Sequence, residues 1–330
     1  MKKMVAVCIG AAFAWLQTHG TPSQWLERAQ RVPLPVLREP EGHRPTVPAE
    51  PMTAQVLERV ELPGDVVVLA AHRDALYAGT FDRGAFRIEN GKLVALPIDS
   101  RVNDLAVAGD GTVYAATNGG AFADARRLSS GAFTAVTIWN GRAAFASTHG
   151  ISIVEGKDFH TLGPAQGIRG DMPSSLADCG VFLCIGASDG VWLFDGSSST
   201  HRQAPEEMVT AVARDDGGAG FARDGRRPQA AASNADVWAG TLASGVARLR
   251  GPAPPALPDN RVSPHALLVH GGAVFIGTPS GLVVLRGGRP KLVRELGPVT
   301  ALAASSRGGL WVGTRNAAVR VDVSERLVMR

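Results

Sequence analysis

Cysteine and histidine are the residue types of this sequence that could carry redox or metal chemistry, and their spacing argues against both. The three cysteines are Cys8, Cys179 and Cys184, and they show no CxxC, haem-attachment or zinc-binding spacing. The eight histidines form no metal-binding pattern, and the chain has no nucleophile elbow, phosphate-binding loop or calcium loop. We therefore expect no catalytic constellation, no metal and no cofactor, which favours a protein that is not an enzyme.

A five-residue signature recurs seven times and identifies the elements that must position every other residue. Its second position is aromatic in six copies, its fourth is always small, and threonine closes six copies. The copies are LYAGT (76–80), VYAAT (113–117), AFAST (144–148), LCIGA (183–187), VWAGT (237–241), VFIGT (274–278) and LWVGT (310–314). Their spacing lies near the length of one propeller blade, about 40–45 residues. The repeat predicts an all-β fold, a seven-bladed β-propeller of four-stranded antiparallel blades.

Each column of the signature predicts a packing role. A large side chain on one face of a strand packs against the neighbouring sheet, and a small residue two positions later lets the sheets approach. Cys184 takes the aromatic position of the fourth copy, so we expect it to be a small buried hydrophobic side chain. Cys179 falls in an expected Cys179-Gly180 turn, and we expect the two sulfur atoms to lie too far apart for a disulfide.

Closing the ring requires a strand from one terminus. QVLERVELP (55–63) aligns with outer-strand segments such as KLVALP (92–97), so it predicts an N-terminal strand that completes the seventh blade. The C-terminal ERLVMR (325–330) is the alternative for the same place. Either strand removes an exposed sheet edge.

The repeats resemble those of the periplasmic two-component-regulator type of propeller, whose units read roughly LWxGTxxGLxR. The closest copies are LWVGTRNAAVRV (310–321), VFIGTPSGLVVL (274–285) and VWAGTLASGVARL (237–249), and the resemblance covers about residues 55–330. It implies a ligand-sensing extracytoplasmic domain, which in that family is often followed by a membrane span and a kinase. Neither follows within these residues, so we do not expect signalling within the same chain.

The N-terminus predicts export. Lys2 and Lys3 precede an apolar run of 13 residues, MVAVCIGAAFAWL (4–16), which as a helix would span roughly 20 Å, short of a bilayer core. Residues 1–20 therefore predict a secretory signal peptide or a short membrane anchor, and the alternative is a buried N-terminal helix. Residues 21–53 predict a short helix and a proline-rich linker, and the propeller is expected at 54–330.

Polar loops on one face of the ring are the candidate binding site. The loops that follow the signature should emerge on this face together with the connections between blades, where ligand sites on scaffolds concentrate. The candidate residues are Asp82, Arg83, Asn118, His149, Asp189, Arg315 and Asn316. The alternative is that these side chains are only solvated turn residues.

An insertion at 215–236 is the largest departure from the repeat. It is rich in Arg, Asp, Gly and Ala, and Arg223, Arg226 and Arg227 are candidates for docking an acidic partner. The alternative is a mobile decoration of the ring. The net charge is +4 and basic residues are scattered among acidic ones, so no nucleic-acid surface is predicted.

Together these patterns predict an exported, monomeric, non-catalytic propeller that binds a protein partner or a small ligand. Two alternatives stay open: a propeller enzyme, such as a lyase or a lactonase-like hydrolase, with its site in the central channel, and a scaffold subunit of a larger envelope complex. A perturbed titratable cluster in the channel would favour the enzyme. An exposed apolar rim would favour the scaffold.

Overall fold

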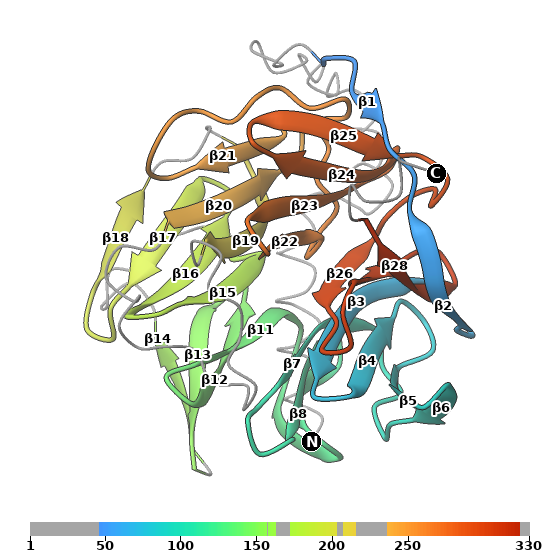
Figure 1. Cartoon of the computed structure of the whole chain (residues 1–330). Helices are drawn as coiled ribbons and strands as arrows, with labels where there is room; N and C mark the ends of the chain where they lie inside the picture. Colours follow the sequence, from blue (N-terminus) through green and yellow to red (C-terminus); the bar gives the residue numbers. More distant parts are fainter. Residues whose placement is uncertain (1–45, 157, 163–171, 203–206, 216–235, 324–330) are drawn as a thin grey trace, which may run out of the picture. The chain divides into compact units, whose positions relative to one another are not determined.

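The computed structural model describes residues 46–156, 158–162, 172–202, 207–215 and 236–323. In this part of the chain the regular structure consists of 28 β-strands in seven sheets (Figure 1). No helix in these ranges is long and apolar enough to cross a membrane.

The blades follow one another in sequence. Blade one contains β3 (Val66–His72), β4 (Ala75–Thr80), β5 (Ala85–Glu89) and β6 (Lys92–Ala95). Blade two contains β7 (Val102–Val107), β8 (Val113–Thr117), β9 (Gly120–Ala123) and β10 (Arg126–Ser130). Blade three contains β11 (Phe133–Trp139), β12 (Arg142–Ser147), β13 (Gly150–Glu155) and β14 (Asp158–Leu162). Blade four contains β15 (Ser175–Cys179), β16 (Phe182–Ala187), β17 (Gly190–Phe194) and β18 (Ser199–Arg202).

The remaining three blades depart from this plan in different ways. Blade five contains β19 (Val209–Asp215), β20 (Asp236–Thr241) and β21 (Val246–Arg248). Blade six contains β22 (Leu267–His270), β23 (Ala273–Thr278), β24 (Gly281–Arg286) and β25 (Arg289–Val293), with the short β1 (Glu50–Pro51) added at its edge. Blade seven contains β26 (Ala301–Ala304), β27 (Leu310–Gly313), β28 (Ala317–Asp322) and, as its outer strand, β2 (Gln55–Glu61).

The inner strands form a closed ring. Each contacts the inner strands of both neighbouring blades, in the order β3, β7, β11, β15, β19, β22, β26 and back to β3. The strand from the N-terminal side completes blade seven, because β2 pairs antiparallel with β28 and Arg59 lies opposite Val319. The predicted N-terminal closure is confirmed, and ERLVMR (325–330) lies outside the described residues.

Blade five has three strands where four were expected. The segment after β21 contains four prolines between residues 252 and 258, and proline has no N–H to donate to a strand ladder. This segment instead lies beside the proline-rich approach to the ring, where the Val47 amide donates to the Leu257 carbonyl at 3.2 Å. The Met52 amide then donates to the Leu292 carbonyl at 3.0 Å, so the chain follows the edge of blade six before it enters β2.

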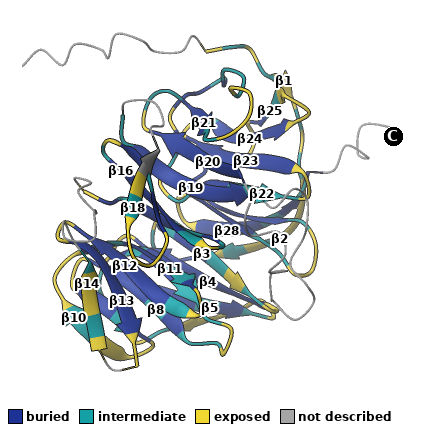
Figure 2. Cartoon of the chain, turned by 90° about the vertical axis from the view of Figure 1, so that its left-hand side faces the viewer, coloured by how far each residue is buried: buried dark blue, intermediate teal, exposed yellow. Residues whose placement is uncertain are grey.

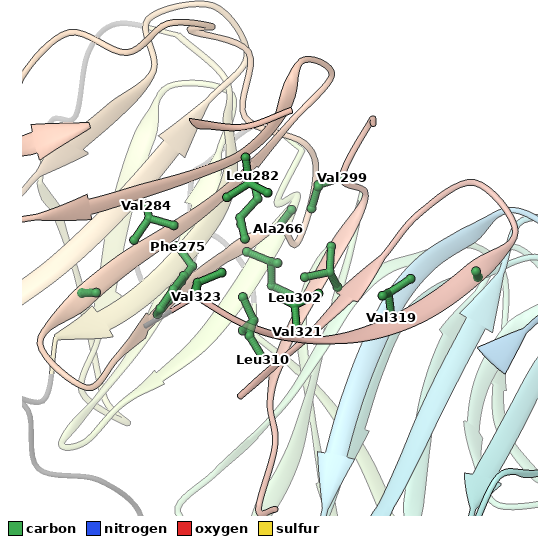
Figure 3. Packing of buried hydrophobic residues seen from close by; sticks show 14 residues of the cluster. Ala266, Phe275, Leu282, Val284, Val299, Leu302, Leu310, Val319, Val321 and Val323 are labelled. Carbon is green, nitrogen blue, oxygen red and sulfur yellow. The ribbon is translucent and has the colours of Figure 1, made fainter. Parts of the chain in front are cut away.

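The hydrophobic core is divided among the contacts between blades. The buried apolar residues described form seven clusters, and each cluster joins two neighbouring blades. Between blades six and seven, Phe275 and Val284 pack with Leu302, Leu310 and Val321 (Figure 3). The strand segments nearest these contacts are buried, and exposed residues concentrate in turns and outer strands (Figure 2). Burial of this apolar area holds the ring together.

The small column of the signature sets the distance between blades, as predicted. A Cβ atom built on Gly79 would lie 2.5 Å from Cγ1 of Val102, the residue that begins blade two. The same atom on Gly240 would lie 2.5 Å from Cγ1 of Val262, which leads into blade six. These positions accept no side chain at the present spacing of the sheets.

The third copy of the signature was aligned one residue too late. Ser147 pairs with Phe133 and with Gly150, as Thr117 pairs with Val102 and with Gly120 in blade two, so Ser147 takes the threonine column. The aromatic column of this copy is therefore occupied by Ala144. Because neighbouring strand residues point to opposite faces, Phe145 packs the other way, with ring centroids 5.7 Å from Phe133 and 6.2 Å from Tyr114 of blade two.

The two cysteines of blade four form a disulfide, contrary to expectation. The turn is Gly180-Val181, so Cys179 ends β15 opposite Phe182, and Cys184 lies two residues further along β16 on the same face. The Cα atoms of this diagonal pair are 5.8 Å apart, within the range that a disulfide spans. Cys184 is fully buried, as predicted, and the bridge lies in the cluster between blades four and five.

Candidate functional site

The turns between second and third strands lie beside the connections between blades, as predicted. The Leu242 amide of one such turn donates to the Met208 carbonyl at 3.1 Å, and the Gly245 amide donates to the Asn260 carbonyl at 2.8 Å. Met208 precedes β19 and Asn260 precedes blade six. We call the surface formed by these turns and connections the loop face.

The hydroxyl that closes the signature fixes these turns in every blade except blade four, where Ala187 takes its place. The Thr80 hydroxyl donates to the Gly84 carbonyl at 2.7 Å and accepts the Arg83 amide at 3.1 Å. The Thr241 hydroxyl does the same with the Gly245 carbonyl and the Ser244 amide, at 2.9 Å and 3.0 Å. Because these threonines are fully buried, their hydrogen bonds give the loop face a rigid frame.

The residues predicted as a site all lie on the loop face and are exposed. Asp82 and Arg83 form an ion pair at 3.4 Å. Asn118 accepts a hydrogen bond from Asn103 at 2.8 Å, and Asp189 accepts one from the Trp192 indole at 3.0 Å.

The other three predicted residues also make local contacts. The His149 amide donates to the Ser147 hydroxyl at 3.2 Å. The carbonyl groups of Arg315 and Asn316 accept the amides of Val66 and Leu62, at 3.0 Å and 2.8 Å. The seven residues are thus distributed over blades one, two, three, four and seven, and their role as a site stays a prediction.

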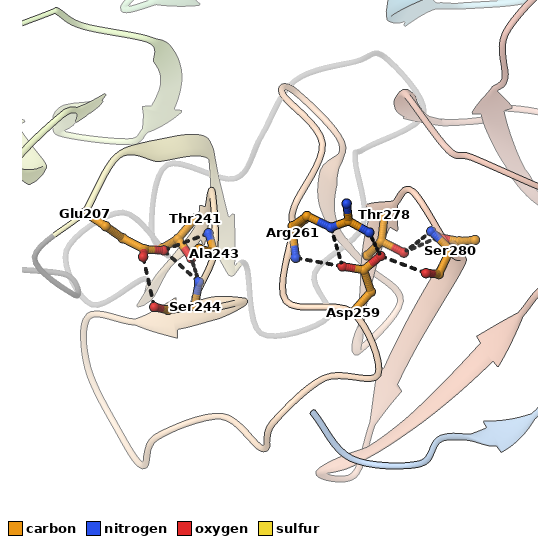
Figure 4. A network of polar contacts seen from close by, with 9 residues as sticks. Glu207, Thr241, Ala243, Ser244, Asp259, Arg261, Thr278 and Ser280 are labelled. Carbon is orange, nitrogen blue, oxygen red and sulfur yellow. Dashed lines mark hydrogen bonds and ion pairs between the residues drawn. The ribbon is translucent and has the colours of Figure 1, made fainter. Parts of the chain in front are cut away.

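On the part of the loop face formed by blades five and six, two buried or half-buried carboxylates accept hydrogen bonds from the turns and connections (Figure 4). Glu207 accepts the amides of Ala243 and Ser244, at 3.1 Å and 2.8 Å, and the Ser244 hydroxyl at 2.9 Å. Asp259 accepts both Nε and Nη2 of Arg261 at 3.1 Å and the Ser280 hydroxyl at 2.7 Å.

These hydrogen bonds keep both carboxylates ionised. Burial alone would raise the pKa of Asp259, but the hydrogen bonds from Arg261 and Ser280 outweigh it and the pKa lies below its ordinary value. Burial and hydrogen bonds oppose each other in the same way at Glu207, and its pKa is also lowered. The Arg261 side chain is 64% exposed, and Asp259 accepts two hydrogen bonds from its guanidinium group. These hydrogen bonds fix the orientation of a guanidinium group that faces solvent.

Exposed apolar side chains share the loop face with these groups. Phe81 is 47% exposed, Leu242 54% and Met172 58%. The Arg101 guanidinium lies 4.0 Å from the centroid of the Phe81 ring and stacks over it. Sequence reasoning missed these residues, although the aligned repeats contain the signal: Phe81 and Leu242 directly follow the closing threonine, where other copies carry Asn118, Ser188 or Arg315.

The ends of the insertion are joined by charged groups. Asp215 and Asp236 lie opposite each other across β19 and β20. Arg248 of β21 pairs with both carboxylates and lies over the Trp238 ring, 5.4 Å from its centroid. Arg223, Arg226 and Arg227 lie outside the described residues. Within the described ranges no group of three or more His, Cys, Asp or Glu residues could hold a metal ion.

Comparison with known proteins bears on the fold. No family model matches the chain, and no curated protein matches its sequence. Solved structures do match it, among them the crystal structure of the WD40 beta propeller domain of Doa1, with a TM-score of 0.61. The chain is a seven-bladed β-propeller.

The likeness to that domain covers 82% of this chain and 98% of the domain, at 8% sequence identity. At so low an identity the likeness shows the fold alone, and propellers of one fold carry many functions. The finer likeness to propellers of the two-component-regulator type stays a prediction.

Proposed function

We propose that this propeller is an exported, non-catalytic module that binds a protein partner through its loop face. The observation that carries the proposal is the set of exposed apolar side chains on this face, Phe81, Met172 and Leu242, together with Arg101 over the Phe81 ring and the exposed Arg261 held by Asp259. Aromatic, methionine and arginine side chains are enriched where proteins bind one another. A frame already fixed by buried threonines would lose little conformational freedom on binding.

Two observations support export. The apolar run after Lys2 and Lys3 is typical of a secretory signal. The disulfide between Cys179 and Cys184 is of a kind that persists in oxidising compartments and is rare in the cytosol. Export predicts that the protein isolated from its native host lacks its leader or is recovered with the membrane, and that it carries no free thiol at Cys179 and Cys184. Mass measurement of peptides with and without reduction checks both expectations.

The scaffold alternative is favoured by a different surface. The outer strands of blades seven and one expose Val56, Leu57, Leu93 and Val94, of which Val56 is 54% and Val94 56% exposed. Blades seven and one are neighbours in the ring, so this apolar rim belongs to one side of the molecule. A partner that docks on the rim would make the propeller a subunit of a larger complex.

One capture experiment distinguishes the two surfaces. The full chain is used to capture partners from periplasmic and membrane fractions of its native host, beside a Phe81→Ser/Leu242→Ser variant and a Val56→Ser/Val94→Ser variant. Both variants exchange two exposed apolar residues for serine, so each is the control for the other. We expect the loop-face variant to capture at least tenfold less partner than the wild type, and the rim variant to capture as much as the wild type. The reverse pattern favours the scaffold, and equal capture by all three proteins contradicts both.

The polar residues predicted from the sequence form a second test of the loop face. Substitution of Arg83 and Arg315 together by alanine should weaken capture of the same partner, because both guanidinium groups lie on this surface. Unchanged capture would remove these two residues from the interface without removing Phe81 and Leu242. The propeller-enzyme alternative stays a prediction.

A further inference from the structure

A buried carboxylate lies on the inner strand of blade two. Asp104 is 6% exposed. One of its oxygens accepts the amide of Leu105 at 2.8 Å, and the other accepts the amide of Val136, in blade three, at 2.9 Å. Asp104 therefore already links two neighbouring blades.

The same carboxylate meets a histidine from the far side of the ring. Nδ1 of His265, which precedes β22 of blade six, lies 3.6 Å from Oδ2 of Asp104, and the two side chains are 15% and 9% exposed. On one way around the ring, blades seven and one separate the two residues, and on the other way blades three, four and five do. A contact between blades two and six must therefore cross the central channel.

The backbone of His265 is held in an uncommon conformation that aims the side chain at this contact. Its φ is 58°, in the left-handed region that residues other than glycine seldom adopt. Its amide donates to the Thr210 carbonyl of blade five at 3.3 Å. The pair thus connects groups from blades two, three, five and six.

The charge of each side chain of the pair depends on whether that side chain carries a proton. Burial is the largest influence on Asp104 and raises its pKa, while the His265 charge and the amides of Val136 and Leu105 act in the opposite direction. The strands that pack against β7 are β3, β4, β8 and β11, and of their titratable side chains, His72, Tyr77 and Tyr114, none acts on this carboxylate. A histidine side chain gains or loses its charge between about pH 5 and 8.

We propose that Asp104 and His265 form a proton-dependent brace across the channel. When His265 carries a proton, it attracts the carboxylate and ties opposite sides of the ring together. When it loses that proton, the carboxylate keeps its amide donors but has no opposite charge in its buried position. Because each apolar cluster described joins neighbouring blades, the brace couples blades that are not adjacent in the ring.

Hydrogen exchange of the full chain tests the brace. Peptides covering 102–107 and 262–270 are followed by mass spectrometry at pH 5.5 and pH 8.0, with correction for the pH dependence of intrinsic amide exchange. We expect opening of these segments to become about two- to tenfold more frequent at pH 8.0 in the wild type. In His265→Asn and in Asp104→Asn this difference should disappear. Asparagine tolerates a left-handed backbone, so His265→Asn removes the charge and keeps the conformation.

A surface pair supplies the matched control. His160 lies 3.8 Å from Glu155, a similar distance, but both side chains are about half exposed. His160→Asn should keep the wild-type response, because water screens that pair. Equal protection of the wild type at the two pH values would overturn the proposal, and so would an unchanged pH response in His265→Asn. If Asp104→Asn does not fold, these two measurements still decide.

Discussion

At the residue scale, two positions of the signature have separable physical roles. The small residue lets the next blade approach, since a Cβ atom at Gly240 would lie 2.5 Å from Val262 Cγ1. The threonine that follows it, Thr241, fixes the next turn, because its hydroxyl donates to the Gly245 carbonyl. Thr241 itself is fully buried. The sequence predicted the first role, and it gave no indication of the hydrogen bonds that explain the second.

The first prediction concerns the spacing of the blades. Gly240→Ala should lower the free energy of unfolding by about 1–3 kcal/mol, because the added methyl group forces the Val262 side chain or the sheet to move. Gly109→Ala is the control, since its Cβ atom would meet nothing within 4 Å. Urea unfolding of both variants measures the difference, and similar values for the two would show that the blades can adjust their spacing freely.

The second prediction concerns the turn. Thr241→Val keeps the shape of the side chain but removes the hydroxyl that donates to the Gly245 carbonyl and accepts the Ser244 amide. The free energy of unfolding should fall by about 1–3 kcal/mol, because buried groups are left unpaired. Thr241→Ser restores the hydroxyl and should recover part of the loss in thermal unfolding. A valine variant as stable as the wild type would contradict this role.

At the scale of the element, one strand decides whether the ring is closed. β2 is the outer strand of blade seven and pairs with β28 from the opposite end of the described chain. It follows a segment that already lies along blade six, where the Ala54 amide donates to Glu295 Oε1 at 2.8 Å. Closure therefore involves the edges of two blades, which the alignment of QVLERVELP with other outer strands did not predict.

The third prediction tests this closure. A chain that begins after residue 61 lacks β2, which should leave the edge of blade seven unpaired and cause aggregation or loss of a cooperative thermal transition. A chain that begins after residue 45 retains β1, β2 and the described contacts of the segment between them. It should unfold cooperatively, close to the full-length midpoint. Equal midpoints for the two truncated chains would show that β2 is dispensable.

At the scale of the whole molecule, a ring of blades has few direct links between distant parts. Its seven apolar clusters, as far as the structure describes them, each join neighbours. Stability in such repeat structures is close to a sum of unit and nearest-neighbour contributions. The Asp104–His265 contact adds a connection across the ring, so its protonation affects the molecule as a whole.

The fourth prediction is the pH dependence of stability from Asp104. Its pKa in the folded protein is raised above the ordinary value of 3.8, so the folded state binds this proton more tightly than the unfolded chain does. The contribution is fully present below that ordinary value and is lost as the pH rises through the folded pKa. The difference in unfolding free energy between the wild type and Asp104→Asn, measured from pH 3.5 upward, should therefore fall as the pH rises, because the carboxylates with lowered pKa values contribute equally to both proteins. A wild type and variant with parallel profiles would contradict this assignment.

The sequence by itself determined the number of blades and the order of strands within most of them, and it favoured the N-terminal strand for closing the ring. These features follow from local turn chemistry and from a period repeated along the chain, and both can be read without knowing distant contacts. An ambiguity of one residue in the alignment of the copies was enough to assign side chains to the wrong face or turn. Ser147 and Thr148 could each close the third copy, and the turn lies at Gly180-Val181 and not at Cys179-Gly180, which brings Cys179 and Cys184 onto one face.

Only the tertiary structure decided which side chains meet. Asp104 and His265 are far apart in the chain, and their contact depends on the diameter of the closed ring and on one left-handed backbone angle. The exposure of Phe81 and Leu242 likewise depends on how each turn lies against the next connection. Repeats specify contacts between like positions of neighbouring blades, whereas contacts across the channel and the exposed surface arise from positions where the copies differ.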